Sequence, residues 1–286
     1  MQPPILVIGA TGRIGRKVVD ELLAVGLPVR ALSRRPEEAG LPAGVEVVAG
    51  DLEKPESLDA GLRGAAAVFL LWTAPPATAP AVVARLAGHA RRVVLLSSPH
   101  QTPHPFFQQP NPMASFHAEL ERLLAAARLE TTILRPGMFA SNSLLWWASQ
   151  IRLGDVVRWP YGAVETAPID ERDIAAVAAR ALAEDRHAGM DYVLTGPERL
   201  TQAGQVEAIG AAIGRRLRFV ELSPDEFRSA MAGAPAPVVD MLLNAWGAAS
   251  GVPAYLTSTV ADVVGRPART FHQWAADHAA EFRFQG

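Results

Sequence analysis

Three glycines near the N-terminus, Gly9, Gly12 and Gly15, stand where an apolar run changes into an amphipathic one. Residues 5–8 are continuously apolar, as in a buried parallel strand, whereas apolar residues from Ile14 onward recur at helical intervals. A strand therefore passes through a glycine turn into a helix. The free N–H groups at such a helix start attract an anion that bare backbone lets approach, so the motif predicts a bound pyrophosphate. A tight turn without a ligand is the alternative.

Two arginines follow the second apolar run, in the stretch "SRRP", where Ser33, Arg34 and Arg35 include no carboxylate. A residue about 20 positions after the glycine loop of a dinucleotide site meets the adenosine ribose, and an acid there favours a free 2′-hydroxyl. Guanidinium groups suit a 2′-phosphate instead, because their hydrogen bonds to phosphate are charge-assisted and often bidentate. The sequence therefore favours NADP over NAD. Alternatively, both arginines are solvated and pair with Glu37 and Glu38.

Asp51 and Leu52 close a third apolar run in "VVAGDLEKPESL". A polar and an apolar side chain at this place suit the two sides of an adenine ring. Alternatively, Asp51 caps the helix that follows.

Apolar runs of strand type alternate with helical patterns up to about residue 136, which predicts a doubly wound parallel sheet, a Rossmann-like α/β fold. The predicted strands are 4–9, 28–33, 45–49, 66–72, 92–97 and 130–135. The predicted helices are 12–25, 56–63, 78–90 and 113–127.

The rest of the chain has an aromatic segment, a helix opened by Asp170, a strand near 190–195 and further helical stretches. We expect an NADP-binding domain over 1–145 to which the chain returns around 166–197. Residues 146–165 and 198–286 are expected to form a smaller, mostly helical lobe for the substrate. The cleft between two such lobes is the usual substrate site.

The composition narrows the class of protein. With 286 residues, 49% of them hydrophobic and 20% charged, the chain is long and apolar enough to fold around a sizeable core. A formal net charge of −2 disfavours nucleic acid as a partner. The absence of cysteine excludes disulfides and thiolate chemistry. No leader, membrane span or metal-ligand spacing is apparent, so we expect a soluble cytoplasmic protein without a metal.

Further motifs carry a resemblance over nearly the whole chain. They are "GATGRIG" (9–15), "SRRP" (33–36), "GDLEKPESL" (50–58), "LLSSP" (95–99), "LETTILRPGMFASN" (129–142), "IDERDIAAVAARAL" (169–182) and "LTGPERLT…IGAAIGRRLRFVELSPDEF" (194–227). In this order they resemble the NmrA-like branch of the atypical short-chain dehydrogenases/reductases. The resemblance implies a Rossmann-like NAD(P)-binding fold with a small C-terminal lobe over the nicotinamide. It implies a reductase, often of quinones or unsaturated carbonyls, or a dinucleotide-binding redox sensor.

The sequence departs from the wider family at the proton donor. Typical members carry a serine after the fifth strand and a Tyr-x-x-x-Lys pair on the next helix. Ser97 and Ser98 are present here, but alignment through Glu121 puts Met113 at the tyrosine position and His117 at the lysine position. The usual acid is therefore missing.

Few other residues offer a proton. His117 is predicted to hold the nicotinamide ribose, to donate a proton, or to lie on the helix surface. His100 and His104 belong to a proline-rich loop beside the expected nicotinamide. Tyr161 and Tyr255 fall in segments that could face the cleft, although packing is the commoner role of such residues.

Aromatic and apolar residues after the sixth strand and on the proline-rich loop are predicted to line a pocket for a flat, apolar molecule. These residues are Phe106, Phe107, Met138, Phe139, Trp146 and Tyr161. A place in the core or at a homodimer contact is the alternative for Trp146 and Trp147. The resemblance also implies that backbone at Pro136 and Gly137 binds the nicotinamide carboxamide.

These observations predict an NADPH-dependent reductase of a small apolar carbonyl, enone or quinone. Ser97 or Ser98 would hold the substrate oxygen, and His117 would hold the ribose. The predicted cofactor contacts are Gly9, Thr11, Gly12, Arg13, Ile14, Gly15, Ser33, Arg34, Arg35, Asp51, Leu52, Trp72, Ser97, His117, Pro136 and Gly137. A non-catalytic NADP(H)-binding regulator and an isomerase or lyase on the same fold are the alternatives.

Overall fold

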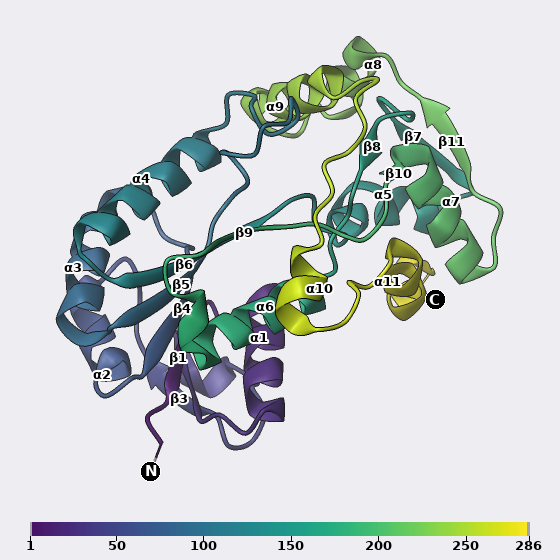
Figure 1. Cartoon of the computed structure of the whole chain (residues 1–286). Helices are drawn as coiled ribbons and strands as arrows, with labels where there is room; N and C mark the ends of the chain where they lie inside the picture. The colour runs from purple at the N-terminus through teal and green to yellow at the C-terminus, as the bar shows by residue number, and fades with distance from the viewer. Residues whose placement is uncertain (1, 285–286) are drawn as a thin grey trace.

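A seven-stranded parallel sheet forms the centre of the computed structural model, which describes residues 2–284 (Figure 1). The strand order is β3-β2-β1-β4-β5-β6-β9. The strands are β1 (Ile5–Ile8), β2 (Val29–Ser33), β3 (Glu46–Ala49), β4 (Ala67–Leu71), β5 (Arg92–Leu96), β6 (Glu130–Pro136) and β9 (Asp191–Leu194). All neighbouring pairs are parallel, so every strand ends at the same edge of the sheet.

Helices cover both faces of this sheet, which confirms the predicted doubly wound fold. One face carries α1 (Arg13–Ala24), α6 (Glu171–Ala183) and α10 (Thr259–Val264). The other carries α2 (Asp59–Leu62), α3 (Ala79–His89) and α4 (Pro112–Ala126). The six predicted strands and four predicted helices are all present, with ends within a residue or two of those expected, except that the second helix begins as a short 3-10 turn. Such turns are η1 (Pro36–Glu38), η2 (Pro55–Leu58), η3 (Pro76–Thr78) and η4 (Asp185–His187).

The second lobe is helical with two small sheets, and it lies at the upper right of Figure 1. Its helices are α5 (Asn142–Leu153), α7 (Gln202–Ile213), α8 (Pro224–Ala230), α9 (Ala236–Ala248), α11 (Phe271–Asp277) and α12 (Ala279–Phe282). β7 (Val156–Trp159) pairs with β11 (Arg218–Glu221), and β8 (Glu165–Thr166) pairs with β10 (Leu200–Thr201). The lobe has its own core, which includes the buried indoles of Trp147, Trp159, Trp246 and Trp274.

The chain passes between the two cores more than once. After α5 it returns as α6, which packs on α1, and as β9, which pairs with β6. After α9 it returns again, because Val260 and Val263 of α10 lie in the cluster that covers the sheet. The exact domain boundaries stay a prediction.

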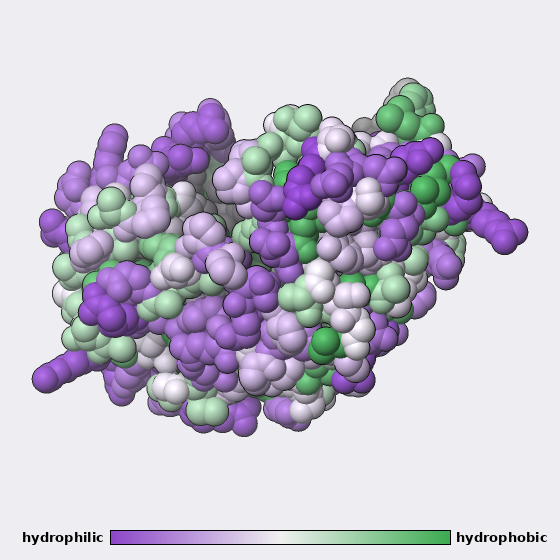
Figure 2. Space-filling model, turned by 90° about the horizontal axis from the view of Figure 1, so that it is seen from above, coloured by the Kyte–Doolittle hydropathy of each residue, from purple (hydrophilic) through white to green (hydrophobic). Residues whose placement is uncertain are grey.

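Surface features give little indication of a partner. Hydrophobic residues lie in small, separate groups on the face that Figure 2 shows. Leu145 and Leu153 of α5 are the most exposed large apolar side chains in the described part of the chain, at 81% and 86%. The predicted homodimer stays a prediction. Between residues 2 and 284, no helix combines the length and the apolar character that crossing a membrane requires.

Candidate active site

The three glycines of the first turn differ in what a side chain would meet at each position. Gly9 has φ +86°, a left-handed conformation that favours glycine. A Cβ on Gly15 would lie 2.0 Å from the carbonyl oxygen of Gly9, so α1 packs directly on the loop backbone. A Cβ on Gly12 would meet only that same oxygen, at 3.4 Å, in an extended conformation that any residue adopts. The fold therefore does not require glycine at position 12.

A groove of about 190 Å³ borders Gly12, so a side chain at this position would enter its open space. Gly12 is the N-cap of α1, where no side chain caps the helix and no acid stands in the first turn. The first N–H groups of a helix have no acceptor within it, and they carry partial positive charge. The open space at Gly12 and these uncapped N–H groups therefore fit the pyrophosphate of a dinucleotide.

The predicted arginines are placed differently. Arg34 lines the groove and makes no hydrogen bond or ion pair within residues 2–284. Arg35 instead pairs with Glu38, with 2.6 Å between Nη1 and Oε2. Ser33 also lines the groove, and its hydroxyl accepts the backbone N–H of Arg35 at 3.1 Å. Of the two arginines, Arg34 is among the residues that line the groove and Arg35 is not.

Other predicted cofactor contacts divide between the groove and its surroundings. Thr11, Asp51 and Leu52 line the groove. The Asp51 carboxylate accepts the N–H of Glu53 at 3.0 Å, so it stabilises the turn rather than capping the next helix. Trp72 lies against Phe116 of α4, with ring centroids 5.4 Å apart, while its neighbours in the chain face the groove. At the outer side of α1, a guanidinium nitrogen of Arg13 lies 3.9 Å from the carboxylate of Glu281.

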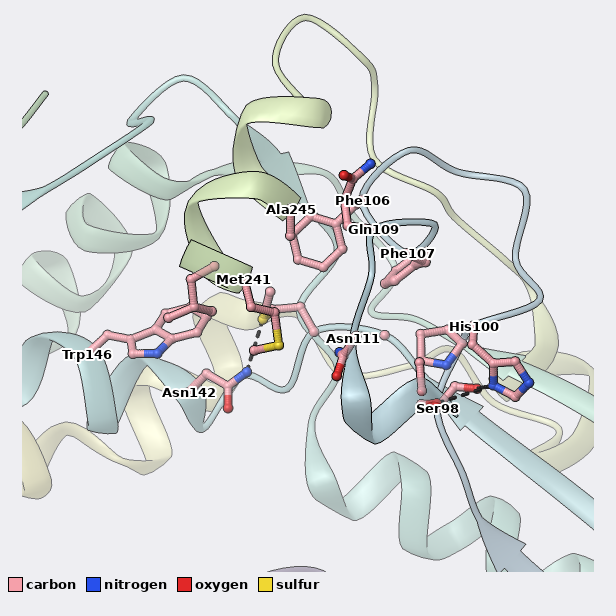
Figure 3. A pocket seen from close by; sticks show the side chains of 15 residues that line it. Ser98, His100, Phe106, Phe107, Gln109, Asn111, Asn142, Trp146, Met241 and Ala245 are labelled. Carbon is pink, nitrogen blue, oxygen red and sulfur yellow. Dashed lines mark hydrogen bonds between the residues drawn. The ribbon is translucent and has the colours of Figure 1, made fainter. Parts of the chain in front are cut away.

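A second cavity, of about 220 Å³, lies beyond the ends of β5 and β6 (Figure 3). Its walls come from the proline-rich loop after β5, from the segment after β6, from α5 and from α9. The lining residues are Ser98, Pro99, His100, Phe106, Phe107, Gln109, Asn111, Ala114, Gly137, Met138, Asn142, Trp146, Met241, Leu242 and Ala245. Ser98 and His100 lie at one side, and Trp146 lies at the opposite side. The cavity therefore combines largely apolar walls with a corner formed by the Ser98 hydroxyl and the His100 imidazole.

Two residues predicted for this pocket lie elsewhere. Phe139 packs against the core that covers the sheet and pairs with Ile169. Tyr161 packs in the second lobe, and a Cβ on Gly247 would come within 3.0 Å of its hydroxyl. Trp146 has both of the roles considered for it, because it lines the cavity and also stacks on Trp159 at 5.8 Å between centroids.

The segment after β6 is only partly free for a cofactor. Pro136 is the last residue of β6, and Gly137 lines the cavity. The N–H of Gly137 donates to the carbonyl oxygen of Leu194 at 2.9 Å, so it is not available to a carboxamide. The predicted role of Pro136 and Gly137 stays a prediction.

Ser97 belongs to a buried ionic cluster behind the cavity. Its hydroxyl donates to the Glu121 carboxylate on α4, and Ser97 is not among the residues that line the cavity. Arg135 of β6, 3% exposed, donates to both oxygens of Glu121 at 2.7 and 2.8 Å. It also donates to Asp191 of β9 at 3.0 Å. Of the two serines, the structure therefore brings only Ser98 to the cavity.

His117 lies on the same face of α4 as Glu121, one turn earlier. Burial lowers its pKa to about 4, with further lowering by His100 and Arg135, although Glu121 opposes the change. The imidazole is therefore neutral at pH 7, and its buried Nδ1 has no hydrogen-bond partner in the described residues. An unpartnered nitrogen fits the predicted bond to a ribose hydroxyl. Met113, at the expected tyrosine position, is 57% exposed.

His100 is the functional candidate that sequence reasoning set aside. Its Nδ1 lies 3.3 Å from the hydroxyl oxygen of Ser98 and 3.1 Å from the carbonyl oxygen of the same residue. Prolines around it predicted a loop, but neither spacing nor periodicity showed which way its ring points. The sequence does carry one signal for His100. It lies two residues after Ser98, at the carboxyl edge of the sheet, where such folds bind their ligands.

Comparison with known proteins agrees with this geometry. Residues 9–185 match the model of a family described as NAD(P)H-binding, and the chain belongs to that family. A (4-alkanoyl-5-oxo-2,5-dihydrofuran-3-yl)methyl phosphate reductase of Streptomyces griseus is 39% identical over 97% of this chain and 99% of its own. An NAD(P)H azoreductase of Xenophilus azovorans is 35% identical over 97% and 99%.

Solved structures add the fold of the whole chain. The NADPH complex of quinone oxidoreductase QOR2 from Escherichia coli superposes with a TM-score of 0.82 at 25% identity, over 96% of this chain and 99% of the other. The chain is thus an NAD(P)H-dependent oxidoreductase of the NmrA-like, atypical short-chain dehydrogenase/reductase group.

Proposed function

We propose that this protein is an NADPH-dependent reductase of a small, neutral, apolar conjugated carbonyl compound, an enone or a quinone. The observation that carries the proposal is the open cavity of about 220 Å³, apolar on most sides, with the Ser98 hydroxyl at its polar corner. NADPH, when bound, supplies a hydride. An open cavity beside the cofactor groove favours an enzyme over a non-catalytic regulator, whose corresponding space would be filled.

The preference for NADPH rests on Arg34. Its guanidinium group lines the groove without a partner among residues 2–284, and no carboxylate stands beside it in "SRRP". A 2′-phosphate would give this charge a partner, whereas a 2′-hydroxyl would give it only a neutral acceptor. Gly12 and the N-terminus of α1 would hold the pyrophosphate shared by both nucleotides.

The preference for a conjugated substrate rests on the missing tyrosine. Reduction of a simple ketone leaves a strongly basic alkoxide, which needs a strong acid in direct contact with its oxygen, and Met113 at the tyrosine position is not one. Hydride addition to an enone or quinone gives a delocalised, less basic oxyanion, which a neutral donor such as the Ser98 hydroxyl stabilises. The names of the relatives agree, since they include a quinone oxidoreductase and a reductase of an oxo-dihydrofuran with an alkanoyl group.

The preference for a neutral substrate rests on the charge of the walls. Within residues 2–284, no lysine or arginine lines the cavity. A phosphorylated molecule, as in the name of the Streptomyces griseus relative, would find no lysine or arginine in these walls. Phe106, Phe107 and Trp146 instead offer ring faces to a flat apolar molecule.

Anaerobic oxidation of NADPH tests the proposal with three acceptors of similar size. They are 2-cyclohexenone, 1,4-benzoquinone and cyclohexanone, with the rate in the absence of protein subtracted. We expect turnover with the enone or the quinone, and turnover of the ketone lower by at least 100-fold. Equal rates with cyclohexanone would contradict the conjugated class, and no turnover with any acceptor would contradict the reductase.

A further inference from the structure

Ser98 and His100 form the polar corner of the cavity, directly after β5 (Figure 3). The imidazole Nδ1 lies 3.3 Å from the Ser98 hydroxyl oxygen, within hydrogen-bond reach. Catalytic hydrogen bonds are often long in the absence of substrate and shorten when it binds. A substrate oxygen that contacts Ser98 is therefore one hydroxyl away from a titratable nitrogen.

Oxygen atoms lie beside both ring nitrogens of His100. The nearest neighbour of Nδ1 is the Ser98 carbonyl oxygen at 3.1 Å, which only accepts. The Nε2 atom is buried without a hydrogen-bond partner in the described residues, and it lies 3.7 Å from a Glu121 carboxylate oxygen, which also only accepts when ionised. Both ring nitrogens therefore lie near oxygen acceptors, and the Arg135 guanidinium also lies beside Nδ1.

The charges around this ring come from three elements. Glu121 and neutral His117 lie on α4, Arg135 lies on β6, and Asp191 lies on β9. Arg135 Nη1 comes within 3.4 Å of His100 Nδ1, but it also donates to Glu121 and to the Ser98 carbonyl oxygen. Asp191, whose side chain is half exposed, pairs with Arg135 rather than with the ring.

We propose that His100 is the source of the proton in the reduction and that it acts through the Ser98 hydroxyl, in place of the missing tyrosine. This inference rests on the proposed function. The conjugated acceptor gains a hydride, and so two electrons, from NADPH, which becomes NADP⁺. As the acceptor oxygen becomes basic, a new O–H bond forms to it while the Ser98 O–H bond breaks. Ser98 then takes the Nδ1 proton, and the neutral imidazole is protonated again from solvent.

The test compares His100→Asn, His100→Ala and Ser98→Ala in the full chain, with 2-cyclohexenone and NADPH as substrates. Asparagine places a polar group where Nδ1 lies but has no proton to release in this pH range. Gln101→Ala is the matched control, because Gln101 is the next residue of the same loop and is exposed. Binding of NADPH, followed by its fluorescence, shows whether each variant keeps the cofactor site.

We expect both His100 variants to lower kcat about 100-fold, at the lower end of the contribution of a positioned acid, with NADPH affinity unchanged. The pH profile of kcat should differ between the parent and both His100 variants, because the variants lack the imidazole. The double variant Ser98→Ala/His100→Asn should be no slower than the slower single variant, because the two residues act in one path.

Two outcomes overturn the inference in distinguishable ways. If the parent reduces 2-cyclohexenone and His100→Asn keeps its kcat and pH profile, His100 only positions Ser98, and the reductase stands without this proton path. If the parent reduces neither this enone nor 1,4-benzoquinone, the proposed function fails and the inference fails with it.

Discussion

The cofactor groove and the apolar cavity both lie at the edge of the sheet where the parallel strands end, but they are assembled from different kinds of segments. The groove takes its residues from the ends of β1, β2, β3 and β4 and the turns that follow them. The cavity takes its residues from the proline-rich loop after β5, from the start of α4, from the segment after β6, and from α5 and α9 of the second lobe. The groove presents backbone and the guanidinium of Arg34, whereas the cavity presents mainly side chains.

This difference separates what each region tolerates. At the groove, the fold requires glycine at position 15 but not at position 12, although both are glycines of one motif. We therefore expect the ligand to set position 12. At the cavity, the shape depends on packing between lobes, so we expect a change there to affect turnover more than cofactor binding. Substitutions in each region test this distinction.

The largest effect is expected at Gly12. Gly12→Val should leave a folded protein and weaken binding of both NADPH and NADH more than 100-fold, because the side chain enters the space for the pyrophosphate. Gly15→Ala is the contrast, since its Cβ would collide with the Gly9 carbonyl and the chain should lose its cooperative thermal transition. Circular dichroism and NADPH fluorescence separate the two results. Unchanged affinity in Gly12→Val would mean that the loop is only a turn.

A second effect concerns the buried cluster behind the cavity. The pKa of His117 is about 4 in the folded protein and 6.5 in the reference state, so the unfolded chain binds more protons between these values. The free energy of unfolding is therefore unaffected by this group above pH 6.5 and decreases as the pH falls toward 4. The full decrease is about 3 kcal/mol, at about 1.4 kcal/mol per pKa unit.

Urea unfolding at pH 7 and at pH 4.5 measures this effect. His117→Leu should lose less stability between the two pH values than the parent does, because it has no buried imidazole to protonate. His272→Gln, a change at an exposed histidine, should match the parent at both values. A His117→Leu protein with the parental pH dependence would place the titrating group elsewhere.

These two regions also differ in how far the sequence predicts them. The groove residues occupy fixed offsets after apolar strands, and parallel pairing brings the strand ends together, so Gly12, Arg34 and Asp51 could be placed from spacing. Spacing left open whether Arg35 binds a phosphate or pairs with a nearby glutamate. The structure pairs Arg35 with Glu38, and both side chains are exposed.

The cavity could be predicted as apolar but not in detail. The loop that holds His100 has no hydrophobic period, so nothing in the sequence fixes the direction of its ring. Phe139 and Tyr161 belong to segments that were expected to line the cavity, yet each packs against one of the two hydrophobic cores instead. The pairs β7 with β11 and β8 with β10 join segments distant in sequence, and strands of two to four residues leave little pattern.

A smaller effect distinguishes the two arginines at the groove. Arg34→Ala should weaken NADPH binding about tenfold and leave NADH binding nearly unchanged, because only the phosphorylated nucleotide uses the charge. Arg35→Ala is the matched control and should change neither affinity by more than about twofold, since Arg35 is not among the residues that line the groove. Equal affinities of the parent for NADPH and NADH would remove the basis for the NADPH preference.

The smallest effect is expected from a substitution of Tyr161. A large effect there would contradict the distinction between the groove and the cavity. Its backbone is held at φ +56°, and its hydroxyl lies against Gly247 in the second lobe rather than at the cavity. No hydrogen bond of this hydroxyl occurs within residues 2–284, so Tyr161→Phe removes no bonded donor. Turnover of 2-cyclohexenone should therefore stay within about twofold of the parent, since a change away from any such feature is usually nearly neutral. A thousandfold loss of kcat with intact NADPH binding would instead identify Tyr161 as a relocated acid, which would require the second lobe to move so that its core residue reaches the substrate.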